Sequence, residues 1–173
     1  MTWPSTPHIA IAAIALTAAL WDLKSRRVPN ALTLGGALLG LAMHAVLNAW
    51  FGLAFALSGW AVGLLLFFPV FALGGMGAGD VKLLAAFGAW LGPWGALWTA
   101  LYGALAGGLM ALVVVLARGY TSAALRNVWS LLGSWILVGV RPVEGVTLSS
   151  SAGPRLPYAV PLAVGALLTV WLR

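Results

Sequence analysis

The sequence predicts an all-α membrane protein, a polytopic helix bundle of about six transmembrane helices with one further helix in the membrane interface. Hydrophobic residues make up 62% of the 173 residues and charged residues only 7%, whereas soluble domains carry roughly 25% charged residues. A helix needs about 20 apolar residues to span a bilayer. The apolar runs therefore leave room for about six spans, and we expect one integral membrane domain, 1–173.

The boundaries of the expected helices follow from the apolar runs. The first run, His8 to Trp21, lacks the basic start and the cleavage site of a secretory signal, so we expect it to remain as the first span. Two longer runs are broken at Asn48 to Gly52 and at Gly92 to Gly95, segments suited to turns at an interface. Pro69 is expected to kink its helix because it lacks a backbone donor. The predicted spans are 8–21, 32–47, 53–73, 81–91 (a partial crossing), a run that resumes after 95 and continues to 117, and 156–172.

The region 118–155 is more polar but contains one apolar stretch, 129–140. This stretch is too short to cross a hydrocarbon core of about 30 Å. Its basic flanks and its tryptophans are typical of a helix that lies among lipid headgroups; these residues are Arg126, Trp129, Trp135 and Arg141. The alternative is a seventh span that is bent by its glycines.

The basic residues predict the orientation in the membrane. If 129–140 does not cross, eight of the nine lie on one side, which the positive-inside rule makes cytoplasmic, and Arg173 lies outside with the N-terminus. The eight are Lys24, Arg26, Arg27, Lys82, Arg118, Arg126, Arg141 and Arg155. The formal net charge is +6. Because these residues lie between apolar segments rather than on one solvated face, we expect them to contact membrane lipid and not nucleic acid.

The chain has only three acidic residues, Asp22, Asp80 and Glu144. The two aspartates fall at helix ends on the same predicted side of the membrane, where an ionisable group by default marks a functional site. For Asp22 the alternative is a solvated loop acid that is balanced by its basic neighbours. For Asp80, which follows a glycine-rich turn, the alternative is a helix N-cap.

Two carboxylates in one low-dielectric recess favour a particular chemistry. They cannot both ionise easily, so we expect them to share a proton near neutral pH. The ionised member can take a proton from a water that attacks a peptide carbonyl, while the protonated member donates to the carbonyl oxygen and then to the leaving amine. No metal or cofactor is expected for such a reaction. The chain has no cysteine, which excludes a thiol nucleophile, and His44 is interpreted as a helix contact.

Five residues beside the aspartates are candidates for shaping the site or binding a substrate. Pro29 and Asn30 suit a turn into the following helix. Gly77 and Gly79 permit close approach of a substrate strand or of the other aspartate. Lys82 lies two residues after Asp80, on a different helix face. We expect it either to set the topology or to raise the local positive potential.

Three segments carry a resemblance to a known family. Residues 22–30 resemble the aspartate-to-Ile-Pro-Asn segment of type IV prepilin peptidases, 77–82 are similar to their GxGDxK signature, and 156–165 resemble their Pro-Tyr-containing final helix. The resemblance implies an aspartic endopeptidase with Asp22 and Asp80 as its catalytic pair. Its substrates would be prepilins or pseudopilins, whose basic leader is removed at the cytoplasmic face of the bacterial inner membrane.

The nearest resemblance is to the short branch that serves Flp or tight-adherence pili. The longer enzymes of the family also methylate the new N-terminus and carry a cysteine-based zinc-binding region, so methyltransferase activity is not expected here. Val28 stands where isoleucine is usual, a conservative change. Glu144 is interpreted as a loop charge, with a contact to the basic leader as the alternative.

A different class of function remains open at this point. A transporter or proton-relay subunit would also need membrane acids, although a relay usually places them at mid-bilayer rather than at helix ends beside basic loops. A structural assembly subunit with two capping acids is the third reading.

Overall fold

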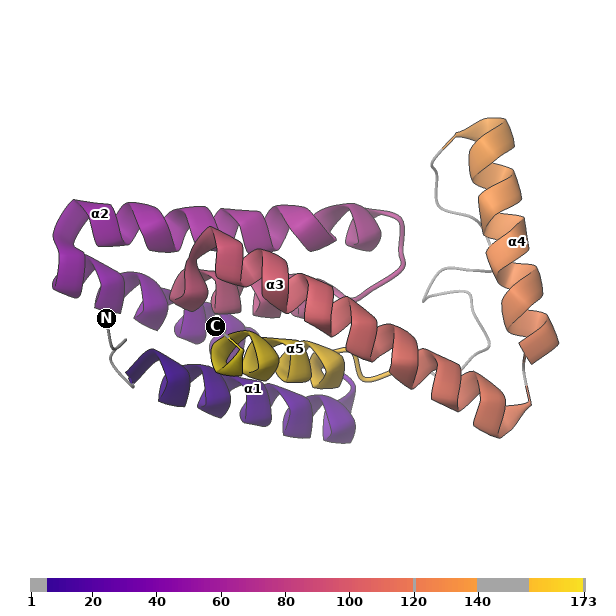
Figure 1. Cartoon of the computed structure of the whole chain (residues 1–173), viewed down its shortest axis with the longest axis horizontal. Coiled ribbons are helices and arrows are strands. Elements are labelled where there is room, and N and C mark those ends of the chain that lie inside the picture. The colour runs from indigo at the N-terminus through magenta and orange to yellow at the C-terminus, as the bar shows by residue number, and fades with distance from the viewer. Residues whose placement is uncertain (1–5, 120, 140–155, 173) are drawn as a thin grey trace.

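A computed structural model of the chain describes residues 6–119, 121–139 and 156–172. These residues form helices and no strand, so the predicted all-α class is confirmed. The helices are α1 (Thr6–Ser25), α2 (Asn30–Ala72), α3 (Ala78–Arg118), α4 (Thr121–Val138) and α5 (Ala159–Trp171). α1, α2, α3 and α5 pack into one bundle, and α4 stands apart beyond the end of α3 (Figure 1).

The helices α2 and α3 each turn back on themselves once. The backbone leaves helical dihedrals at Asn48 and Ala49 in α2 and at Gly92 in α3, and Figure 1 shows two legs on either side of each break. Both breaks lie where the sequence predicted them. Gly92 has a φ of 72°, a conformation that glycine adopts without a steric penalty, and Pro93 then starts the second leg without needing a donor.

The two turns contact each other. The Phe55 ring, just after the turn of α2, lies directly against Gly92 in the turn of α3. His44 is buried at 5% exposure and donates from Nε2 to the carbonyl oxygen of Trp90 at 3.1 Å. The Trp90 indole in turn donates to the carbonyl oxygen of Gly36 at 2.8 Å. His44 therefore joins helices, which agrees with its interpretation from the sequence.

Close packing in the bundle depends on small residues. Gly59 in α2 lies against the backbone of Gly88 in α3, and Gly63 lies against the backbone of Ala85 one turn further along. In α5, Gly165 lies against the backbone of Gly103. Such contacts let helix backbones approach closely, which is how membrane helices gain packing energy without a hydrophobic driving force between them.

Within the part of the chain that the structure describes, three helices are long and apolar enough to cross a membrane, namely α1 over Pro7–Ser25, α2 and α3. Helix α5 is apolar but has only 13 residues. The predicted count of about six spans is not confirmed by these criteria, because α2 and α3 are single helical elements of 43 and 41 residues that each bend once.

One local prediction is wrong and another stays a prediction. Pro69 lies in the last turn of α2, where the backbone keeps helical dihedrals, so the kink expected there is not marked by a break like the one at Asn48. The helix predicted at 129–140 begins earlier, at Thr121, and ends at Val138. The polar residues before Trp129 continue one amphipathic helix, and Leu125, Val128 and Trp129 are exposed together along it. The predictions for Arg141, Glu144 and Arg155 lie outside the described residues.

Candidate functional site at one end of the bundle

The end of α1 and the beginnings of α2, α3 and α5 meet at one end of the bundle. α1 and α5 run side by side in opposite directions, which places the last turn of α1 beside the first turn of α5 (Figure 1). α1 ends at Ser25 because Arg26 takes a left-handed conformation, with a φ of 54°. Pro29 then adopts an extended conformation as the N-cap of α2. The turn that Pro29 and Asn30 were expected to make is therefore present.

Asp22 points into the bundle from the last turn of α1. Its side chain is buried, at 5% exposure, and Oδ2 accepts a hydrogen bond from the backbone N–H of Ala159 at 3.1 Å. The charge of Arg26 also acts on this carboxylate. The alternative of a solvated loop acid is therefore wrong, because a buried carboxylate with a fixed donor from α5 is part of the tertiary structure.

Asp80 lies in the first turn of α3 but is not its N-cap. The N-cap is Gly77, which has no side chain to cap the helix, and Asp80 follows three residues later. Its carboxylate reaches back and accepts a hydrogen bond from the Gly77 backbone N–H, as the acidic member of a capping box does. A Cβ on Gly77 would lie 3.2 Å from Oδ2 of Asp80, so the glycine leaves room for this carboxylate.

The two aspartates come together although they lie far apart in the sequence. The charge of Asp22 is among those that act on Asp80. Asp22 is held by α5 and Asp80 by the glycine-rich turn before α3. An arrangement of two electrostatically coupled carboxylates, one buried and one half-buried, can perform general acid and general base chemistry together.

The remaining candidates fasten the start of α3 to the start of α2. A Cβ on Gly79 would lie 3.3 Å from the Cβ of Val28 and 3.6 Å from its backbone nitrogen and oxygen. Lys82 donates from Nζ to Oδ1 of Asn30 at 2.9 Å, and both side chains are exposed. The glycine therefore permits close approach of two backbone segments, and the lysine has a polar partner on α2 that its position in the sequence did not indicate.

Two residues at the start of α5 belong to this region and were not among the predicted site residues. Ala159 supplies the amide that holds Asp22. Tyr158 is half-buried, and the charge of Asp80 acts on its hydroxyl. The only signal for them in the sequence is the resemblance of 156–165 to a Pro-Tyr-containing final helix.

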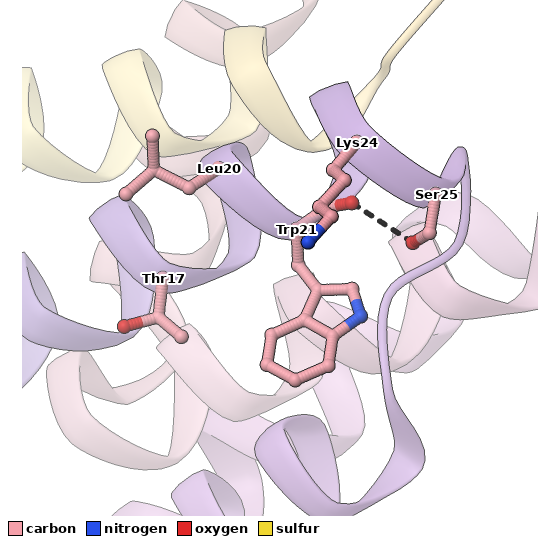
Figure 2. A pocket seen from close by; sticks show the side chains of 5 residues that line it. All are labelled: Thr17, Leu20, Trp21, Lys24 and Ser25. Carbon is pink, nitrogen blue, oxygen red and sulfur yellow. Dashed lines mark hydrogen bonds between the residues drawn. The ribbon is translucent and has the colours of Figure 1, made fainter.

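A shallow hollow of 490 Å³ lies close to this end but is not part of the site. It is lined by one face of α1, as Figure 2 shows: Thr17, Leu20, Trp21, Lys24 and Ser25. Ser25 donates from its hydroxyl to the Trp21 carbonyl oxygen at 2.9 Å along the edge of the hollow. Asp22 does not line it, because its carboxylate points to α5.

No group of three or more His, Cys, Asp or Glu side chains that could hold a metal is found among residues 6–119, 121–139 and 156–172.

Comparison with known proteins agrees with the geometry. The sequence matches the type IV leader peptidase family over residues 9–112, more than half of the chain, and this range holds both aspartates and the start of α3. No curated protein and no solved structure gives a match. On the strength of the family match, the chain belongs to the type IV leader peptidase family.

Proposed function

We propose that the protein is an aspartic endopeptidase that removes the basic leader from type IV prepilins or pseudopilins, with Asp22 and Asp80 as its catalytic pair. Membership of the family supports a leader peptidase with a prepilin-type substrate in general. The observation that supports the aspartic mechanism is that the charge of Asp22 acts on the carboxyl group of Asp80, although the two residues come from different helices. No nucleophilic side chain is needed for such a reaction.

In the proposed reaction the pair shares one proton. The ionised carboxylate takes a proton from a water molecule, whose oxygen bonds to the carbonyl carbon of the scissile peptide, while the protonated carboxyl donates to the carbonyl oxygen. The tetrahedral species then collapses and the carbon–nitrogen bond breaks. The leaving amine takes up the proton of the protonated carboxyl, while one hydroxyl of the tetrahedral species gives its proton to the other carboxylate, so the pair again holds one proton. The hydrogen bonds from Ala159 to Asp22 and from Gly77 to Asp80 would hold the two side chains in place through both steps.

We further propose that this end of the bundle faces the cytoplasm at the bacterial inner membrane. Lys24, Arg26, Arg27 and Lys82 are exposed around the site, and the positive-inside rule favours the cytoplasm for such a cluster. On this proposal six segments enter the bilayer: α1, the two legs of α2, the two legs of α3, and α5. Helix α5 is about 20 Å long by its rise per residue, so it would begin below the membrane surface.

The resemblance of 22–30 and 77–82 to the short branch of the family supports Flp or tight-adherence prepilins as substrates. A substrate of this kind lies in the bilayer with its scissile bond close to the interface. The glycine-rich turn before α3 is partly exposed, at Gly75 and Ala78, and could pair with an extended strand through backbone groups.

The test is co-expression of the protein with a Flp-type prepilin, followed by gel separation of the uncleaved and cleaved forms. Asp22→Asn and Asp80→Asn are each expected to leave only uncleaved prepilin, because both proton transfers need a titratable carboxyl. The amount of each variant in the membrane fraction serves as the control for folding. Normal processing by either variant would refute the proposal, and a loss of proton or solute transport with normal cleavage would favour a proton relay.

A further inference from the structure

Two hollows lie along α1, and the pair of aspartates uses neither of them. The first lies at the end of the bundle that holds Asp22, and its volume is 490 Å³ (Figure 2). The second has a volume of 550 Å³ and lies further along the helix, where Ala10, Ala13 and Ile14 line it. Both volumes fall in the range of about 300–1,000 Å³ that is typical of ligand sites.

The two hollows lie on the same face of α1. Ile14, the last α1 residue of the second hollow, is followed three positions later by Thr17, the first residue of the other. Leu20 and Trp21 follow Thr17 at spacings of three and four, and Lys24 follows them at the same spacings. Residues spaced in this way share one side of a helix. The hollows therefore form one depression along the helix, which we call the α1 groove.

The chemistry of the α1 groove changes from one end to the other. Far from the aspartates, its opposite wall is the first leg of α2 between Leu39 and Leu47, and the buried Trp90 also lines it. Every side chain that lines this part is hydrophobic. At the other end lie Trp21 and Lys24, which are both exposed. An indole suits the level of the lipid headgroups, and the lysine adds a positive charge there.

The length of the α1 groove fits one phospholipid. From Ala10 to Lys24 it extends for about 21 Å along the helix axis. A lipid in one leaflet occupies half of a hydrocarbon core of about 30 Å and a headgroup zone of roughly 5–7 Å. The apolar part of the groove would therefore contact an acyl chain, and the lysine would lie at the depth of the phosphate group.

The apolar helix of a prepilin is the other candidate occupant, but charge and position favour a lipid. Lys24 and Arg27 are both exposed at the polar end of the groove. They repel a basic leader and attract an anionic headgroup. In addition, Asp22 faces α5 and lines neither hollow. A helix in the groove would thus lie on a different face of α1 from the carboxylate.

We propose that the α1 groove binds one anionic phospholipid, with an acyl chain along its apolar part and the phosphate group beside Lys24. The inference requires only that the chain lies in a membrane, so it does not rest on the proposed function. A lipid bound in this way would join α1 to the first leg of α2 along the groove.

The headgroup is tested on the full chain, purified and freed of lipid in a non-ionic detergent. Native mass spectrometry follows its titration with phosphatidylglycerol or with phosphatidylcholine of the same acyl chains. We expect phosphatidylglycerol to bind about fivefold more tightly, the factor that one lysine contributes at an anionic surface. Lys24→Gln should remove this preference, and Lys24→Arg should keep it. Equal affinities in the wild type, or a preference that survives Lys24→Gln, would overturn the proposal.

The acyl chain is tested by filling the apolar part of the groove with Ala13→Phe or Ala42→Phe. Both alanines line the groove and are exposed, so the larger side chain enters the groove and not the core. Each variant should bind phosphatidylglycerol about tenfold more weakly, as expected when roughly two methylene groups are displaced. Ala104→Phe, at an exposed position in the second leg of α3, is the matched control and should bind as the wild type does. Equal binding by all three variants would contradict the proposed position of the lipid.

A cleavage assay with a prepilin distinguishes the other occupant. If Ala13→Phe raises KM for the prepilin and leaves lipid binding unchanged, the groove holds the substrate helix and the proposal is wrong. If the wild type cleaves no prepilin, the proposed function fails, while the lipid titrations still decide whether the groove binds a phospholipid.

Discussion

Replacing Gly79 by alanine should separate catalysis from stability. The new Cβ would lie 3.3 Å from the Cβ of Val28, whereas carbon atoms pack comfortably at about 3.5–4.0 Å. The starts of α2 and α3 must therefore move apart by roughly half an ångström. Strain of this kind costs about 1 kcal/mol or slightly more, while alanine inside a helix gains up to about 1 kcal/mol over glycine. The two effects nearly cancel in the free energy of unfolding.

Catalysis should be more sensitive than stability, because the displaced turn carries Asp80. A misplacement of about 1 Å can reduce a rate by about 100-fold, so we expect roughly a tenfold loss of kcat for leader cleavage from half that shift. The assays are the cleavage rate on a purified prepilin and unfolding in mixed micelles.

Two further variants make the Gly79→Ala result decisive. Gly35→Ala in α2 places a Cβ where nothing lies within 4 Å, so it should cleave at the wild-type rate. Val28→Gly in the Gly79→Ala background removes the contacting Cβ and should restore part of the lost rate. Wild-type cleavage by Gly79→Ala, with unchanged stability, would show that the close approach at Val28 does not set the position of Asp80.

Two other substitutions test contacts described above. Lys82→Met should reduce the rate of cleavage by about two- to tenfold, as expected for the loss of one hydrogen bond. Asn30→Asp should keep the wild-type rate, because an aspartate still accepts from Lys82. Equal rates in the wild type and both variants would show that the contact between Lys82 and Asn30 does not matter for cleavage. Gly59→Ala should lower the free energy of unfolding by about 1–3 kcal/mol, because its Cβ would collide with the backbone of α3. Gly35→Ala is the control and should not lower it. Equal free energies of unfolding for the two variants would contradict the close packing of Gly59 against α3.

The sequence predicted the features that depend on local chemistry. The turns at Asn48 and Gly92 were found because a polar residue in an apolar run, or a glycine before a proline, interrupts a helix wherever it lies. The kink expected at Pro69 is not marked by a break in the helical dihedrals. The start of α4 was missed because polar residues in an amphipathic helix look like a loop.

The site could be predicted only in part, for a physical reason. The two aspartates stood out because acids are rare in this chain, and the structure places them where the charge of Asp22 acts on Asp80. Their catalytic role stays a prediction. The partners that hold the site, Ala159 for Asp22 and Asn30 for Lys82, are set by tertiary packing between distant segments. No local pattern marks a backbone amide that will face a carboxylate from another helix.

The meeting of three helix beginnings at one carboxylate pair has an electrostatic consequence. Each helix start carries a partial positive charge of about half an elementary charge from its aligned peptide dipoles. The beginnings of α2, α3 and α5 all adjoin the site. Together these dipoles would attract the negative charge that develops on a peptide oxygen during hydrolysis. Because α2 and α3 each fold back on themselves, their chains return to the same end of the bundle. This return allows the positive helix ends to converge there.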